Sequence, residues 1–116
     1  MTPPRNVRTL NRIEFLVLSV LVEGPRHGYG IAQEIDRRTG GEIVPRPGSL
    51  YRVLDRLTRR TLVEPTEDAP AAASASTDER RSYYALTEEG RVAVRTEAEL
   101  LASLARRVLA EGEGHA

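Results

Sequence analysis

The sequence predicts a mainly α-helical protein with a small β-hairpin, and three observations lead to this fold class. Apolar residues recur at helical spacing in three consecutive segments of the first half of the chain. Two short β-rich segments follow, on either side of an acidic stretch of low complexity. One long amphipathic segment occupies the last part. Three helices, two paired strands and a final helix are the elements of a winged helix-turn-helix with a C-terminal dimerisation helix.

The first two helices are expected over 9–23 and 28–39. Phe15, Leu18 and Val22 lie on a different side of the first helix from its main apolar face, which carries Leu10, Ile13, Val17, Val20 and Leu21. A helix that is apolar on two sides is buried on two sides. We therefore expect the main face to pack in its own domain and Phe15, Leu18 and Val22 to meet a partner subunit.

The third helix, expected over 47–60, carries apolar residues on one side and arginines on the other. Its apolar set follows the spacing i, i+3, i+4, i+7 and consists of Leu50, Val53, Leu54 and Leu57. At 100° per residue the opposite side collects Ser49, Arg52, Arg56, Arg59 and Arg60. Because Arg46 is a poor N-cap, Ser49 is a candidate for the true cap. This helix can bury its leucines while it offers guanidinium groups to an anion such as DNA.

Two short strands, at 62–64 and 82–86, are expected to form the wing. Pro65 cannot donate a ladder hydrogen bond, so it places the first strand at a sheet edge or ends it. Between the strands, the wing loop at 66–79 is acidic and lacks large apolar residues, which predicts disorder. One of the two strand tyrosines, Tyr83 and Tyr84, is expected in the core and the other outside it.

A long final helix is expected over 87–112, capped by Thr87. One stripe along it consists of Val94, Ala98, Leu101, Leu104, Ala105, Val108 and Leu109. At ~1.5 Å per residue the helix is roughly 36 Å long, which is more than a three-helix domain can cover. Because an uncovered leucine stripe is a liability, a second copy of the chain is expected on it. The predicted organisation is an N-terminal arm at 1–8, a winged helix-turn-helix at 9–86, the dimerisation helix at 87–112 and a tail at 113–116.

Composition narrows the classes of function. The chain has 17 basic and 17 acidic residues, so its net charge gives no support for nucleic-acid binding. An argument for nucleic-acid binding therefore depends on where the charged residues lie. All basic residues are arginine, which suits bidentate contacts to phosphate and guanine, although codon bias explains this as well. The lack of cysteine excludes disulfides and fits a cytoplasmic location, and no apolar run is long enough for a membrane span. The two histidines are isolated and no cysteine accompanies them, so we expect no metal site. No set of nucleophile, base and orienting residue is visible, so we expect that the protein is not an enzyme and has no cofactor.

Three sequence blocks resemble the signature of the PadR family of transcriptional regulators. They are G-P-R-H-G-Y-G-I at 24–31, P-G-S-L-Y-R-V-L-D-R-L at 47–57 and R-R-S-Y-Y-A-L-T-E-E-G at 80–90. The resemblance implies a dimeric repressor of the short PadR form that binds a palindromic operator and is often released by a small molecule. It also implies that DNA is contacted by the residues matching the family's contact positions, which are Tyr29, Ser49, Tyr51, Arg80 and Arg81.

The chain departs from the family pattern in three places. A glycine usually precedes the first wing strand, but Arg60-Thr61 stands there. The wing loop is long and acidic, so contact with DNA is expected from Arg80 and Arg81 at its base rather than from its tip. Some short relatives clamp flat drugs between tryptophans, and this chain has no tryptophan.

The sequence therefore predicts a homodimeric, sequence-specific repressor that binds double-stranded DNA. The expected DNA-binding residues are Tyr29, Arg46, Ser49, Tyr51, Arg52, Arg56, Arg59, Arg60, Arg80 and Arg81. Among them, Arg52 and Arg56 are expected to read bases, and Arg46, Arg59 and Arg60 to contact phosphates.

The expected dimer interface consists of Phe15, Leu18, Val22, Val94, Ala98, Leu101, Leu104, Ala105 and Val108. A small-molecule effector, if the protein has one, is expected between the final helices and the first helix. The alternative is a small-molecule-binding or protein-interaction dimer with incidental DNA binding, which the neutral charge and the acidic loop favour.

Overall fold

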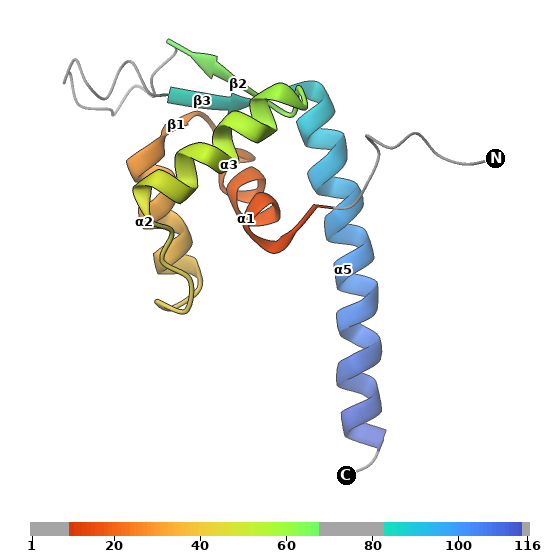
Figure 1. Cartoon of the computed structure of the whole chain (residues 1–116). Helices are drawn as coiled ribbons and strands as arrows, with labels where there is room; N and C mark the ends of the chain where they lie inside the picture. The colour runs from red at the N-terminus through yellow and green to blue at the C-terminus, as the bar shows by residue number, and fades with distance from the viewer. Residues whose placement is uncertain (1–9, 68–82, 115–116) are drawn as a thin grey trace.

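The computed structural model describes residues 10–67 and 83–114, and the expected arm at 1–8 and most of the wing loop lie outside these ranges. A helical domain carries a small sheet at one end, and one long helix extends away from it (Figure 1). The elements in chain order are α1 (Arg12–Leu21), β1 (Arg26–His27), α2 (Gly28–Arg38), α3 (Pro47–Arg59), β2 (Val63–Thr66), β3 (Tyr83–Leu86) and α5 (Glu88–Gly114).

Side-chain caps determine where the first two helices begin. Asn11 caps α1: its side chain accepts a hydrogen bond from the Glu14 N–H at 2.8 Å, and the Glu14 carboxylate accepts one from the Asn11 N–H at 2.9 Å. This capping box places the start of α1 three residues after the expected position. His27 caps α2, where its Nδ1 accepts a hydrogen bond from the Gly30 N–H at 3.0 Å.

The third helix begins at Pro47, with Arg46 as an N-cap that makes no side-chain hydrogen bond. The suggestion that Ser49 is the cap is therefore wrong, because Ser49 lies within the first turn. Proline stabilises this start, since its fixed φ suits the first helical position and its missing N–H would have no intrahelical partner there.

The sheet has three antiparallel strands in the order β1-β3-β2, so the expected hairpin gains a third strand. Arg26 pairs with Tyr84 and His27 with Tyr83 across β1 and β3. A strand of two residues is too short to show an alternating pattern, which is why the sequence did not predict it. Pro65 lies within β2, and β2 is an edge strand, as proline requires.

The hydrophobic core lies between α1, α2, α3 and the sheet. Val17, Leu18, Val20, Ile31, Ile35, Leu54 and Leu57 are all 0% exposed. Tyr83 is buried in β3, while Tyr84 is partly exposed. The core thus joins the apolar faces of the first three helices, which is what holds α3 on the domain surface.

The start of α5 is closely packed against the segment that joins α3 to β2. Thr87 caps α5 by accepting a hydrogen bond from the Gly90 N–H at 2.9 Å, and it donates one to the Thr61 carbonyl at 2.6 Å. Gly90 lies so close to the Leu62 carbonyl that a Cβ would stand 2.0 Å from its oxygen. Beyond this junction α5 leaves the domain, and every residue from 98 to 111 is exposed (Figure 1).

Candidate nucleic-acid interface

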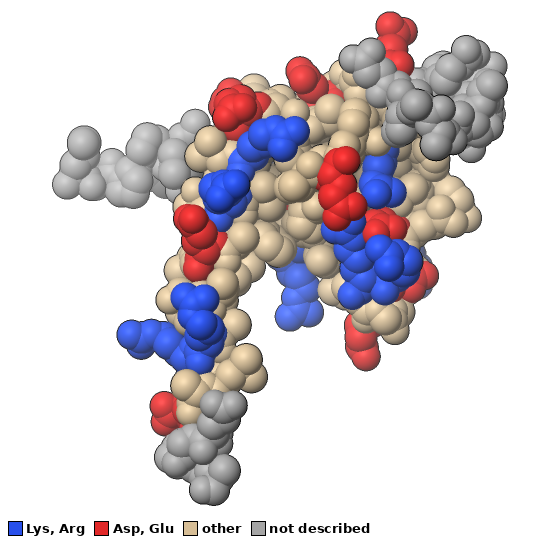
Figure 2. Space-filling model, turned by 180° about the vertical axis from the view of Figure 1, so that it is seen from behind, with Lys and Arg blue, Asp and Glu red and all other residues tan. Residues whose placement is uncertain are grey.

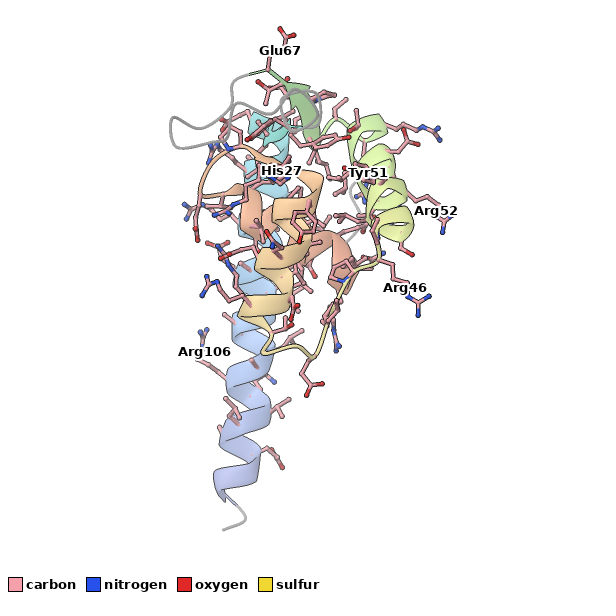
Figure 3. All side chains as sticks on the ribbon, turned by 90° about the vertical axis from the view of Figure 1, so that its left-hand side faces the viewer. His27, Arg46, Tyr51, Arg52, Glu67 and Arg106 are labelled. Carbon is pink, nitrogen blue, oxygen red and sulfur yellow. The ribbon has the colours of Figure 1, made fainter. Side chains whose placement is uncertain are left out.

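The outward ridge of α3 consists of Gly48, Arg52, Asp55 and Arg59, which are all exposed and lie opposite the buried leucines. Arg59 forms an ion pair with Asp55 at 2.9 Å, so part of its charge is compensated within the ridge. No described residue forms an ion pair with Arg52. Arg46 and Arg52 project from the same side of the molecule, away from the domain (Figure 3). The ridge and the start of α3 therefore present two guanidinium groups, those of Arg52 and Arg46, that are available for an anion.

Two of the arginines expected on this surface form ion pairs with a carboxylate of α1, although the Arg56 side chain remains 43% exposed. Arg56 donates from Nε to Oε2 of Glu14 at 2.8 Å, and Arg60 donates from Nη1 to the same oxygen at 3.3 Å. The Arg60 side chain is only 17% exposed. These contacts restrict both side chains, and the expected contact of Arg56 and Arg60 with DNA stays a prediction. They lie on the flank of α3 that faces α1, about 70–110° away from the middle of the ridge at 100° per residue.

Glu14 remains charged although it is only 4% exposed. Burial by itself would raise the pKa of this carboxyl group. The hydrogen bond from the Asn11 backbone, the hydrogen bond from Arg56 and the charges of Arg56 and Arg60 lower the pKa, and together they hold it below its ordinary value of 4.5. The sequence contains the signal for the helix cap, which is Asn11 followed three residues later by Glu14. It contains no signal for the ion pairs of Glu14 with Arg56 and Arg60, which are 42 and 46 residues away along the chain.

The N-terminus of α3 adds backbone donors to the same side. The first intrahelical hydrogen bond runs from the Leu50 N–H to the Arg46 carbonyl at 2.8 Å. The amides of Gly48 and Ser49 precede it, so they point out of the helix start without an intrahelical acceptor. Arg46 and the exposed Ser49 hydroxyl flank these amides. Such an arrangement suits a phosphate oxygen.

Two tyrosines extend the surface towards α2 and the sheet. Tyr29 is 66% exposed and stacks on His27 with 6.2 Å between the ring centroids. Tyr51 is 42% exposed and packs on Gly28, where a Cβ would lie 2.7 Å from the tyrosine oxygen. His27 and Tyr51 lie on facing elements in Figure 3. The close contact explains why a glycine stands at 28 and shows that the first two sequence blocks meet in space.

Tyr84, on β3, is partly buried and packs against the hydrophobic core. Burial raises the pKa of Tyr84 above its ordinary value of 10, and the nearby Tyr51 and Asp55 raise it further. Tyr84 therefore stays neutral at physiological pH. The remaining expected contacts, Arg80 and Arg81, lie outside the described residues.

The expected dimer surface divides into buried and exposed parts. Leu18 is 0% exposed and Val94 is 6% exposed, so both belong to the core of their own domain, and their assignment to a subunit interface is corrected. Leu101, Leu104 and Val108 are 40%, 48% and 70% exposed. Further exposed apolar residues on α5, which the expected interface omitted, are Val92, Leu100 and Leu109.

An open groove of about 730 Å³ runs between α1 and α5. Its apolar lining includes Phe15, Val22, Val92 and Ala98, and Arg91, Arg95, Glu88 and Glu99 lie along its α5 side. Basic and acidic side chains are interspersed on the face shown in Figure 2, with no broad surface of one sign. No helix in the described part of the chain is long and apolar enough to cross a membrane.

Comparison with known proteins identifies the family. Residues 17–96 match the PadR-like family of transcriptional regulators. A crystal structure of a PadR family transcription regulator from Clostridium difficile is 25% identical, with a TM-score of 0.70 over 87% of this chain and 97% of that chain.

Two curated relatives are longer proteins. A 37.1 kDa uncharacterised protein of a transposon from Streptomyces fradiae is 37% identical over 84% of this chain, which spans 25% of that protein. The transcriptional regulator YqjI of Escherichia coli is 28% identical over 67% of this chain, which spans 33% of YqjI. The family match covers more than half of the chain and includes the domain that carries α3, so the chain belongs to the PadR-like family of transcriptional regulators.

Proposed function

We propose that this protein is a homodimeric transcriptional repressor that recognises a palindromic DNA operator through α3. The observation that carries the proposal is the outward ridge of α3, on which Arg52 has no ion-pair partner among the described residues and Arg46 stands at the helix start. A helix held by leucines on one side and exposed on the other can enter the major groove, as the second helix of a helix-turn-helix does.

The contacts on this surface divide into two kinds. Arg52 lies in the middle of the ridge, where a guanidinium can bind guanine O6 and N7 with two hydrogen bonds. Arg46, Arg59 and the amides at 48–49 would contact phosphates, which position the protein without reading sequence. Tyr29 and Tyr51 flank these contacts, and Arg80 and Arg81 stay in the proposed set on the resemblance to the family.

Selection of DNA fragments from the genome by the purified protein tests the proposed recognition of DNA. Arg52→Ala should reduce the preference for the selected fragment over shuffled DNA, because a good bidentate base contact contributes about 1–3 kcal/mol of discrimination. Arg59→Ala should weaken binding to both DNAs and lower the salt dependence. Equal effects of the two changes would contradict the division of roles. A wild-type protein without preference for any fragment would favour the small-molecule or protein-interaction dimer.

We also propose that a second copy of the chain covers the exposed stripe of α5. Leu101, Leu104 and Val108 would otherwise present adjacent apolar side chains to water along a helix that the domain does not cover. Leu101→Glu should therefore produce monomers, as measured by light scattering. Ser103→Glu adds the same charge on the opposite side of α5 and should leave the dimer intact. A stable Leu101→Glu dimer would show that the interface lies elsewhere.

The groove between α1 and α5 is the proposed site for a small-molecule effector. Its volume of about 730 Å³ lies within the ordinary range of ligand pockets, and its lining is largely apolar with charged groups at one side. An effector there would favour a dimer whose two α3 helices are spaced differently from the operator half-sites. A compound that releases the selected DNA from wild type should lose this effect in Ser19→Tyr, which fills the groove from α1.

A further inference from the structure

We infer that Glu14 is a positioning residue for DNA recognition, because it holds α3 in the orientation in which Arg52 can read bases. This inference rests on the function proposed above and extends it to a residue that does not touch DNA. Glu14 lies on α1 and is buried, whereas the ridge is on the exposed side of α3, opposite its buried leucines.

The carboxylate of Glu14 is held from its own helix before it reaches α3. Its Oε1 accepts a hydrogen bond from the Asn11 N–H at 2.9 Å, and the Asn11 side chain accepts one from the Glu14 N–H at 2.8 Å. This reciprocal cap restricts the side chain to one geometry. The Glu14 Oε2 atom therefore has a fixed position relative to α1 when it contacts α3.

Oε2 binds two arginines that lie one turn apart on the flank of α3. Arg56 Nε is 2.8 Å away and Arg60 Nη1 is 3.3 Å away. Like charges at i and i+4 repel each other, and the shared carboxylate compensates this repulsion. The leucine face fixes how deeply α3 packs, but hydrogen bonds to a charged group are short and directional, so they also fix its rotation about its own axis.

A small rotation of α3 is enough to disturb base contacts. Side chains extend to about 5–6 Å from a helix axis, so a rotation of ~10° moves an outward group by roughly 1 Å. Hydrogen bonds between nitrogen and oxygen tolerate only a few tenths of an ångström around 2.9 Å. Phosphate contacts depend on long-range attraction and are less sensitive to such a shift. Loss of the Glu14 contacts should therefore reduce specificity more than overall affinity.

The same carboxylate connects α3 to the helix that meets α5. α1 contacts both α3 and α5, and Phe15, the neighbour of Glu14, lines the groove between α1 and α5. The orientation of α3 is thus tied through α1 to α5, on which the second copy is proposed to dock. Glu14 would set the position of each recognition helix relative to the dimer.

Glu14→Gln tests this role, since glutamine preserves the size of the side chain and can still accept the capping hydrogen bond. The measurement is the ratio of affinities for the fragment selected from genomic DNA and for a shuffled fragment. The ratio should fall about tenfold, the effect of one lost base contact. Affinity for shuffled DNA should stay equal or rise, because two arginines lose their carboxylate. A merely structural role would lower the folded fraction and reduce both affinities equally, leaving the ratio unchanged.

Glu34→Gln is the matched control. Glu34 also binds two arginines, Arg37 and Arg38, and its substitution changes the net charge by the same amount, but its partners lie on α2. This variant should keep the wild-type ratio. An equal fall in both variants, or a folded Glu14→Gln protein with the wild-type ratio, would overturn the inference.

The triple change Glu14→Met with Arg56→Met and Arg60→Met covers the case in which Glu14→Gln does not fold. Replacing all members of a partly buried ion-pair cluster by apolar side chains is often tolerated, so this protein should fold and should show the same fall in the ratio. Retention of the wild-type ratio would again overturn the role of Glu14. A wild-type protein that does not distinguish the two fragments would instead refute the repressor function, and the inference would fall with it.

Discussion

Replacement of Gly90 by alanine should destabilise the protein strongly, because the start of α5 leaves no room for a side chain there. The added Cβ would lie 2.0 Å from the Leu62 carbonyl oxygen, 3.0 Å from its carbonyl carbon and 3.0 Å from Leu86 Cδ2. Real Cβ atoms essentially never come closer than 3.0 Å to such an atom, so the overlap with the oxygen is 1.0 Å (3.0 − 2.0). The obstacle is backbone, and the Leu62 carbonyl is itself fixed by the Thr87 N–H at 3.2 Å.

The magnitude follows from two opposing effects. Overpacking in a tight site costs about 1–3 kcal/mol and occasionally more, and the backbone obstacle places Gly90→Ala at the upper end. The higher helix propensity of alanine offsets about 1 kcal/mol. The net loss in the free energy of unfolding is about 2 kcal/mol, which corresponds to a melting temperature lower by roughly 8 °C in a chain of this length.

Thermal unfolding followed by circular dichroism measures this loss, with Gly48→Ala as the control. Gly48 is also helical, but nothing lies within 4 Å of its ideal Cβ, so only the gain in helix propensity operates. The control should melt at the wild-type temperature or a few degrees above it. If Gly90→Ala melted as high as Gly48→Ala, α5 would not be packed against the Leu62 carbonyl, and the junction described here would be wrong.

Two further predictions concern strain and acid stability. Thr61 has a φ of 59°, a left-handed conformation that is costly for a β-branched residue. Thr61→Gly should therefore raise the free energy of unfolding by about 1 kcal/mol, despite the loss of the hydrogen bond between Thr61 and Glu89. An unchanged or lower urea midpoint would contradict this prediction. Hydrogen bonds from Arg37 and Arg38 lower the pKa of Glu34 from 4.5 to about 2, so its contribution to stability is present above pH 4.5 and is lost as the pH falls towards 2. Glu34→Gln should therefore flatten the decline of melting temperature between pH 4.5 and 2, and an equally steep decline in wild type and variant would refute this assignment.

The sequence by itself determined the helices, the buried face of α3 and the order of the helices and wing strands, but not β1. The spacing of Leu50, Val53, Leu54 and Leu57 predicted both α3 and its buried side, and all four are buried. This works because burial of a helix face depends on periodicity along one segment, which is a local property. Three blocks in the expected order then predicted the family, which the family match over 17–96 confirms.

Only the tertiary structure decided which polar groups are free and which are used inside the molecule. Arg52 and Arg56 are equivalent in the sequence, but Arg56 lies on the flank of α3 that meets Glu14, and Arg52 lies on the ridge. Leu18 belongs to the core and not to a subunit interface, because the second apolar side of α1 is covered at this residue by the same domain and not by a partner. Both outcomes depend on how separate elements are placed against each other, and contacts across more than 40 residues leave no periodic trace in the chain.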